Sequence, residues 1–335
     1  MTTTRRRLIL DVDTGIDDSL AILYALASPE SELLALTCVS GNVEAGQVAR
    51  NTLGLLELAG RPEIPVALGR EVPLARPLMT APETHGPRGI GYATLPEPTA
   101  SLSATHAADL IVEHAHRDPG AVTLVTLGPL TNVAVALERE PALPRLLNGL
   151  VMMAGAYRSP GNTAPTSEWN VAVDPEAMAA VLAGWAAHAR AAVELPRALG
   201  LDVTERAKLT PEHLARLRAA ASLPEDDALL GFVDDALRFY MEFHSRYDGF
   251  YGAFIHDALA VAVALDPALA RSEALAVEVE LAGRWTTGET VADWRRSWGR
   301  PANLDIVVEA DISAFFERLI ERLATLARSR ATAPG

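Results

Sequence analysis

Short apolar runs alternate with amphipathic helical patterns through the first half of the chain, and this alternation most constrains the fold. The strand-like runs occupy residues 7–12, 33–39, 64–68, 121–127 and 150–153, and the helical patterns occupy 17–27, 45–59, 105–117 and 130–140. Strands that are apolar along their whole length are buried on both faces, which is typical of a parallel sheet covered by helices. The pattern predicts an α/β fold with a mostly parallel, doubly wound, Rossmann-like sheet and helices on both faces.

The second half of the chain is more helical. Helices are predicted at residues 175–185, 211–221, 226–247, 256–265 and 312–327, and late strands at 274–281 and 304–308. No internal repeat, low-complexity tract or domain linker divides the sequence, so residues 1–335 are expected to form one domain with a frayed end at 328–335. The Pro- and Gly-rich segment 69–103 is long enough to predict a functional lid or a disordered loop.

Charge and cysteine content narrow the classes of partner. The net charge of −14 disfavours nucleic acid polymers and anionic membranes but is compatible with a neutral small-molecule substrate. Cys38 is the only cysteine, so no intrachain disulfide can form, which fits a reducing compartment. The apolar run that follows the basic N-terminus ends at Asp11 and is too short for a signal peptide. The chain is therefore expected to be cytoplasmic, with no membrane partner.

Four carboxylates follow the first predicted strand within eight residues: Asp11, Asp13, Asp17 and Asp18. A helix N-terminus stabilises a single anion by about 0.3–1 kcal/mol, so helix capping accounts for one of them but not for four. Crowded carboxylates raise one another's pKa unless a cation compensates their charge. The cluster predicts a bound cation, and purely oxygen ligands favour Ca²⁺ or Mg²⁺ over zinc.

Two classes of protein are compatible with parts of this acidic pattern. Asp11 and Asp13 could form the Asp-x-Asp nucleophile motif of haloacid-dehalogenase-type phosphatases. Those enzymes also need a distal cation, and the only lysine, Lys208, is not followed by the second acidic pair they require. A small-molecule binding protein is the non-enzymatic alternative.

The motifs that follow the cluster form an ordered set. They are DVDTGIDD at residues 11–18, SGN at 40–42, LGPLTN at 127–132, GN at 161–162, EWN at 168–170, DP at 174–175 and HD at 256–257. This set resembles the nucleoside hydrolase family, the inosine-uridine preferring nucleoside N-ribohydrolases, over roughly residues 7 to 310. The resemblance implies an enzyme of purine or pyrimidine salvage that hydrolyses ribonucleosides to ribose and free base, and it suggests a homodimer or homotetramer.

The resemblance also implies a role for particular residues. The ligands of a Ca²⁺ ion would be Asp13, Asp18, Asp257 and the backbone carbonyl of Leu127. Asp17 would be the general base that takes a proton from the attacking water, and His256 would be the candidate acid that protonates the leaving base. A ribose-binding or nucleoside-binding protein, the non-enzymatic alternative, would not need Asp17 beside a metal-bound water. The substrate would be bound by Asn42, His85, Met153, Asn162, Glu168 and Asn170, with His85 contributed by the long loop.

Structural roles are the alternatives for several of these residues. Asn132 is expected to be a structural cap, Asn162 could be a turn residue, and Asp174 is expected to cap a helix that begins at Pro175. The acidic residue that the family usually carries after its His-Gly loop motif is Arg88 here, and this departure leaves the loop's role in substrate choice open. The aromatic side chains between residues 239 and 254 are either core packing or a wall that stacks on the nucleobase.

Overall fold

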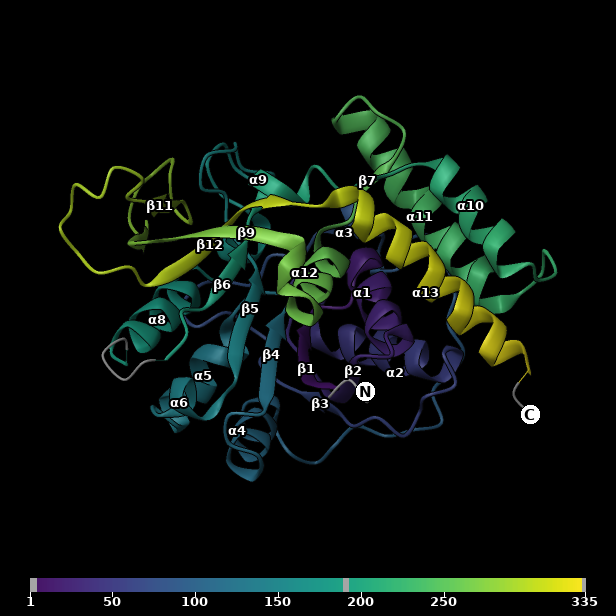
Figure 1. Cartoon of the computed structure of the whole chain (residues 1–335), viewed down its shortest axis with the longest axis horizontal. Coiled ribbons are helices and arrows are strands. Elements are labelled where there is room, and N and C mark those ends of the chain that lie inside the picture. The colour runs from purple at the N-terminus through teal and green to yellow at the C-terminus, as the bar shows by residue number, and fades with distance from the viewer. Residues whose placement is uncertain (1–4, 189–192, 333–335) are drawn as a thin grey trace.

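The computed structural model describes residues 5–188 and 193–332 (Figure 1). The main sheet of the protein has eight strands. The strand order is β3-β2-β1-β4-β5-β6-β12-β9. The strands are β1 (Arg6–Val12), β2 (Ser31–Cys38), β3 (Val66–Leu68), β4 (Val122–Thr126), β5 (Gly149–Met153), β6 (Arg197–Leu199), β9 (Ala270–Leu275) and β12 (Leu304–Ala310). All neighbouring strands are parallel except β9, which pairs antiparallel with β12 at the edge. The predicted mostly parallel, doubly wound sheet is confirmed.

The order of the strands reverses between β1 and β4. From β1 the chain adds β2 and β3 on one side, and it then returns to place β4, β5 and β6 on the other side. Asp11 lies opposite Thr126 in the parallel register, so the carboxyl ends of β1 and β4 meet at one edge of the sheet. In doubly wound sheets, ligands bind in the crevice at such a switch point.

Helices cover both faces of the sheet (Figure 1). The helices of the larger core are α1 (Ile16–Ala27), α2 (Ala45–Leu58), α10 (Pro211–Ala221), α11 (Ala228–Tyr247), α12 (His256–Leu265) and α13 (Ile312–Thr332). The helices of the opposite core are α4 (Ala107–Arg117), α5 (Thr131–Arg139) and α8 (Pro175–Ala186). Within β1, Leu8 and Leu10 point into the first core and Ile9 into the second, as the pleat of a strand requires.

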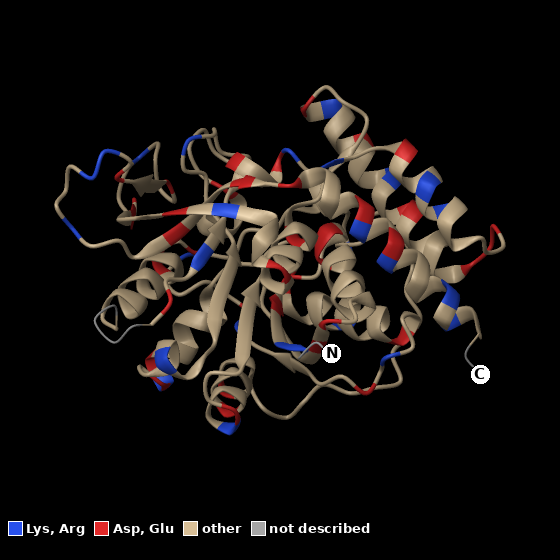
Figure 2. Cartoon of the chain, viewed as in Figure 1, with Lys and Arg blue, Asp and Glu red and all other residues tan. Residues whose placement is uncertain are grey.

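Short elements complete the described chain. The short helices are α3 (Pro82–His85), α6 (Leu143–Leu146), α7 (Trp169–Val173), α9 (Leu201–Thr204) and the 3₁₀ turn η2 (Pro267–Leu269). Two small antiparallel ribbons pair β7 (Lys208–Leu209) with β8 (Ala253–Phe254), and β10 (Val277–Val279) with β11 (Thr290–Ala292). Charged residues lie mainly on helices and loops, whereas β4 and β5 carry none (Figure 2). In the part of the chain that the structure describes, no helix combines the length and hydrophobicity of a membrane span.

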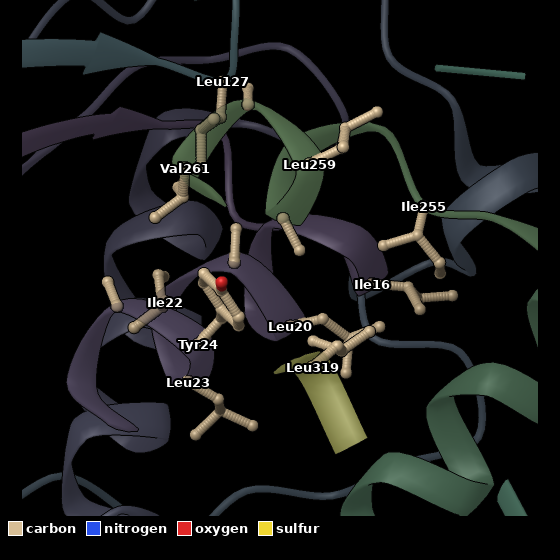
Figure 3. Close-up of a cluster of buried hydrophobic side chains, with 14 of the residues drawn as sticks. Ile16, Leu20, Ile22, Leu23, Tyr24, Leu127, Ile255, Leu259, Val261 and Leu319 are labelled. Carbon is tan, nitrogen blue, oxygen red and sulfur yellow. The ribbon is translucent and has the colours of Figure 1, made fainter. Parts of the chain in front are cut away.

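Helix α1 is packed into the core along most of its length. Every residue from Ile16 to Ala25 is buried, and Leu20 lies beside Leu319 of α13 (Figure 3). Full burial of one such side chain stabilises the fold by about 1.5–3 kcal/mol. Since α1 also carries Asp17 and Asp18, this packing fixes the position of both carboxylates.

Two expectations about the late elements were wrong. The predicted strand 274–281 is two strands, because the chain leaves the sheet edge after Leu275 and pairs again, as β10, with the separate strand β11. The closing helix continues to Thr332 rather than ending at residue 327, and residues 333–335 of the expected frayed end lie outside the described residues. The short β6 was not predicted, since three residues are too few to show a pattern.

Candidate active site

The turn between β1 and α1 holds the first group of carboxylates. β1 ends at Val12 and α1 begins at Ile16, so Asp17 and Asp18 lie in the first helical turn. The Asp18 carboxylate accepts hydrogen bonds from the backbone N–H groups of Gly15, at 2.9 Å, and Asp13, at 3.2 Å. It thereby pairs with N–H groups that would otherwise lack a partner at this helix end. Local backbone geometry thus orients Asp18 without any basic side chain.

A second helix brings another carboxylate to the same point. Asp257 lies in the first turn of α12, and carboxylate oxygens of Asp17, Asp18 and Asp257 lie within 4.8 Å of one another. All three side chains are buried. Two helix N-termini therefore converge on one cluster, and each contributes a partial positive charge that favours anions.

Asp13 lies beside this cluster in a tightly fitted position. Its Oδ2 accepts a hydrogen bond from the backbone N–H of Asn42 at 2.8 Å, while its buried Oδ1 has no hydrogen-bond partner among the described residues. A Cβ atom at Gly41 would lie 2.1 Å from Oδ2, and one at Gly128 would lie 2.8 Å from Oδ1. Glycines at these two positions therefore make room for the Asp13 carboxylate.

Burial and mutual repulsion raise the pKa values of this cluster. The pKa of Asp17 rises to about 8, first because the side chain is buried and then because of the charge of Asp18. Burial, reinforced by neighbouring carboxylates, also holds the pKa values of Asp13 and Asp257 well above their usual range. The charges that act on Asp257 are all acidic: Asp17, Asp18, Asp13 and Glu168. A cluster of hard oxygen donors that lacks internal compensation and includes an unpartnered oxygen fits a divalent cation such as Ca²⁺.

The backbone carbonyl of Leu127 lies at the carboxyl end of β4 and is held from the other side. Asn170 Nδ2 donates to this carbonyl at 2.6 Å and to the carbonyl of Met153 at 3.0 Å, so it ties the ends of β4 and β5 together. Asn132 has a structural role, as expected, but not as a cap. Its Nδ2 donates to Asp11 Oδ1 at 2.8 Å and to the Cys38 carbonyl at 3.1 Å, linking β1 to β2.

A cavity of about 420 Å³ opens above the cluster. Its lining contains every predicted site residue except Asp13 and Asp18, which are buried below it. The predicted residues that line it are Asp17, Asn42, His85, Leu127, Met153, Asn162, Glu168, Asn170, His256 and Asp257. The volume lies within the usual range for small-molecule sites, about 300–1,000 Å³.

Two predicted histidines lie on the cavity wall, and both are buried. His85 ends the short helix α3, and its Nδ1 accepts a hydrogen bond from the backbone N–H of Ile16 at 3.2 Å. His256 Nδ1 lies 2.8 Å from the Thr204 hydroxyl. Burial, followed by the charge of His244, lowers the pKa of each histidine to about 3, so both rings are neutral in this state. Arg88 is not part of the cavity lining.

Three polar residues of the later motifs accept hydrogen bonds from backbone N–H groups, as residues with a structural role do. The Glu168 carboxylate accepts from the backbone N–H groups of Gly155 and Asn170, at 3.0 and 2.8 Å. Asn162 Oδ1 accepts from the N–H of Trp169 at 3.0 Å. Asp174 caps α8 by accepting from the N–H of Ala177 at 3.0 Å, which confirms its expected role. Glu168 and Asn162 nevertheless face the cavity, so structural and binding roles coincide there.

Aromatic side chains of α11 and β8 form another part of the cavity wall. The side chains that line the cavity are Tyr240, Phe243, His244, Tyr247 and Phe254. This arrangement supports the interpretation of residues 239–254 as a binding wall, although Tyr240 and His244 are also well buried.

His244 and Asp248 were not predicted as site residues. His244 Nδ1 lies 2.7 Å from Asp248 Oδ2, and both residues line the cavity. The buried His244 Nε2 has no hydrogen-bond partner among the described residues. The spacing of four residues on a helix is the one signal in the sequence that could have indicated this pair.

Comparison with known proteins places the chain in a family. The model of the inosine-uridine preferring nucleoside hydrolases matches residues 8–317. A pyrimidine-specific ribonucleoside hydrolase, RihA, from an Enterobacter species is 38% identical over 95% of this chain and 97% of its own length. The solved structure of a purine-preferring ribonucleoside hydrolase from Gardnerella vaginalis has a TM-score of 0.88 at 30% identity, covering 97% of this chain and 100% of that one.

A plant nucleoside hydrolase structure is similarly close, with a TM-score of 0.85 at 30% identity over 95% of this chain and 99% of that one. Both the sequence match and the structural match extend over nearly the whole chain, and they include the segments that converge on the cavity. The chain therefore belongs to the inosine-uridine preferring nucleoside hydrolase family of enzymes.

Proposed function

We propose that this chain hydrolyses the N-glycosidic bond of ribonucleosides to give ribose and a free nucleobase. The observation that carries the proposal is that charged groups and aromatic groups lie on different sides of the cavity. Buried carboxylates occupy its floor, and histidines and aromatic rings occupy its wall. A ribosyl group above the carboxylates and a base beside the rings would place the scissile bond between them. Membership of the nucleoside hydrolase family supports this orientation.

In this proposal the floor binds Ca²⁺ through Asp13, Asp18, Asp257 and the backbone carbonyl of Leu127. The unpartnered Oδ1 of Asp13 and the exclusively acidic surroundings of Asp257 support such an ion. When bound, Ca²⁺ would supply a positive charge that lowers the pKa of a nearby water. The ligands are all hard oxygen atoms, as Ca²⁺ requires.

Asp17 is the proposed general base. It reaches the carboxylate cluster and also lines the cavity, whereas Asp13 and Asp18 do not reach the cavity. A carboxylate in this position can take a proton from the water that attacks the sugar carbon. The remaining negative charge of the floor would stabilise the positive charge that develops on the ribosyl group.

Asn42, Met153, Asn162, Glu168 and Asn170 are the proposed ribose contacts. Amide groups can donate and accept hydrogen bonds and a carboxylate accepts them, so together these groups suit a diol. Their backbone hydrogen bonds hold them before substrate arrives, as the two bonds from Asn170 Nδ2 illustrate. Preorganisation of this kind reduces the entropy lost on binding.

His256 is the proposed acid for the departing base, and His85 from the loop is a proposed substrate contact beside it. Both rings face the cavity on the side of Tyr240, whose ring centroid lies 5.4 Å from that of His85. Aromatic rings that line a cavity suit stacking on a planar base.

The relatives include a pyrimidine-specific enzyme at 38% identity and a purine-preferring enzyme at 30% identity. A hydrolysis screen over inosine, guanosine, adenosine, uridine and cytidine, with 2′-deoxy controls and a reducing-sugar assay, therefore tests the proposal and assigns the base preference. No release of sugar from any ribonucleoside would refute it. We further infer a cytoplasmic salvage enzyme that assembles as a homodimer or homotetramer.

Activity is predicted to depend on Ca²⁺. Exhaustive chelation should abolish hydrolysis, because the carboxylates would lose the charge that compensates them, and added Ca²⁺ should restore it. Reducing-sugar release measured after dialysis, with Mg²⁺ added in a parallel sample, checks both steps. Full activity of metal-free protein would contradict the proposed cation.

The metal-free protein is predicted to lose stability as the pH rises from about 4 to about 8. The ordinary pKa of an aspartate side chain is 3.8. In the fold, the pKa of Asp17 is about 8 and that of Asp11 is about 7. The folded state thus binds more protons than the unfolded state across this window, so the free energy of unfolding falls with pH. Urea denaturation with and without Ca²⁺ measures this. Asp17→Asn should weaken the dependence, and an unchanged or rising stability would contradict it.

Replacement of the general base is predicted to affect turnover more than metal binding. Asp17→Asn should lower kcat by roughly 10²–10⁴-fold, the usual range for general base catalysis. Ca²⁺ affinity, measured by calorimetry, should largely survive. A comparable loss of Ca²⁺ binding would make Asp17 a ligand instead.

Replacement of His256 is predicted to separate two kinds of substrate. His256→Ala should slow natural nucleosides strongly, since their bases leave poorly without a proton. It should barely affect p-nitrophenyl riboside, whose leaving group departs as an anion. Steady-state kinetics on both substrates gives the comparison. If both slow equally, His256 positions the ribose or supports Asp257.

A further inference from the structure

We propose that Thr204 is a positioning residue that fixes the tautomer and the ring orientation of His256, so that Nε2 is the nitrogen left free for the substrate. This inference rests on the proposed function, in which His256 acts on the departing base. Thr204 belongs to none of the sequence motifs described above and does not line the cavity. Its effect would therefore pass entirely through His256.

The hydroxyl of Thr204 makes two hydrogen bonds, one with a carbonyl oxygen and one with a ring nitrogen. Oγ1 lies 3.2 Å from the carbonyl oxygen of Gly200, to which it donates, and 2.8 Å from His256 Nδ1. A hydroxyl has one hydrogen and two lone pairs, and a carbonyl oxygen can only accept. With the hydrogen of Thr204 used at Gly200, the hydroxyl offers His256 a lone pair, and the 2.8 Å contact is then made by an N–H on Nδ1.

A neutral imidazole carries its hydrogen on one nitrogen only. With Nδ1–H directed at Thr204, Nε2 carries a lone pair and can take up a proton from water. The imidazolium then keeps its Nδ1–H on Thr204 and can give the Nε2 proton to the departing base. The opposite tautomer would leave Nδ1 facing a hydroxyl whose hydrogen is already used at Gly200. Thr204 would have to turn its hydrogen from the Gly200 carbonyl to Nδ1, and the carbonyl would keep its bonds from the backbone N–H groups of Val203 and Thr204 but lose the hydroxyl donor.

The surroundings make this contact rigid. Thr204 is fully buried at the end of α9, and its donation to the carbonyl four residues earlier fixes the side-chain rotamer. His256 begins α12 and is itself almost fully buried, with the Phe254 ring centroid 5.8 Å from its own. The next residue, Glu205, lines the cavity. The α9 end thus forms one side of the slot that holds the His256 ring.

The direct test is the tautomer of His256. Long-range ¹H–¹⁵N correlation spectra of the whole protein distinguish Nδ1–H from Nε2–H rings, and His256→Ala assigns the signals. We expect Nδ1–H in the wild type, a shift toward Nε2–H or a mixture in Thr204→Val, and recovery in Thr204→Ser. A wild-type ring in the Nε2–H form, or a tautomer unchanged in Thr204→Val, would overturn the inference.

Kinetics gives the second readout. Thr204→Val should lower kcat on nucleosides by about 10- to 100-fold, the range found when the hydrogen-bond partner of a metal-bound histidine is removed. KM should change little, p-nitrophenyl riboside should be spared, and Thr204→Ser should recover most of the rate. Equal slowing of both substrates would indicate a merely structural role and overturn the inference.

A matched control separates positioning from the general loss of a buried hydroxyl. Thr123 is also buried, and its Oγ1 accepts a hydrogen bond from Asn148 Nδ2 at 2.9 Å near the amino end of β4, away from the cavity. Thr123→Val should leave the His256 tautomer and both substrate rates unchanged. If wild type and variants hydrolyse no nucleoside while the tautomer still responds to Thr204→Val, the positioning holds and the proposed function fails.

Discussion

The repulsion among buried carboxylates is the constraint on which the site is organised. Asp17, Asp18 and Asp257 lie within hydrogen-bonding and ion-binding reach of one another, and burial removes the water that would screen them. Two helix N-termini offset part of this repulsion, and backbone N–H groups take up the oxygens of Asp18. The uncompensated remainder appears as the raised pKa values of Asp13, Asp17 and Asp257. A divalent cation is the simplest charge that removes it.

The sheet explains why carboxylates from distant segments meet at all. The reversal of strand order between β1 and β4 leaves a gap at their carboxyl ends, the usual place for a ligand in a doubly wound sheet. Asp13 enters this gap from β1 and the Leu127 carbonyl enters it from β4. Helix α12 then delivers Asp257 because its apolar side chains pack against α1 (Figure 3). Hydrophobic packing therefore supplies the free energy that holds the charged groups together.

The sequence predicted the features that are encoded locally. The buried strands and amphipathic helices of the first half showed the fold class, and four carboxylates within eight residues indicated an acidic cluster. The His244–Asp248 pair and Thr204 were not predicted, because their importance depends on which segments pack together. Thr204 meets His256 across 52 positions of sequence, and nothing at residue 204 signals that contact. For the same reason, the apolar alternation at 274–281 concealed a change of sheet between β9 and β10.

The hydrogen bonds divide the polar residues of the cavity into two groups. Glu168, Asn170 and Asn162 are held by the backbone, so their geometry is set before a ligand arrives. Asp13 Oδ1 and His244 Nε2 are buried and lack a partner among the described residues, a state that costs about 1–3 kcal/mol per group. One such atom lies beside the carboxylate floor and the other in the aromatic wall. In the proposed binding mode, a cation below the cavity would take up Asp13 Oδ1, and a nucleobase beside the aromatic wall would offer a hydrogen-bonding partner to His244 Nε2.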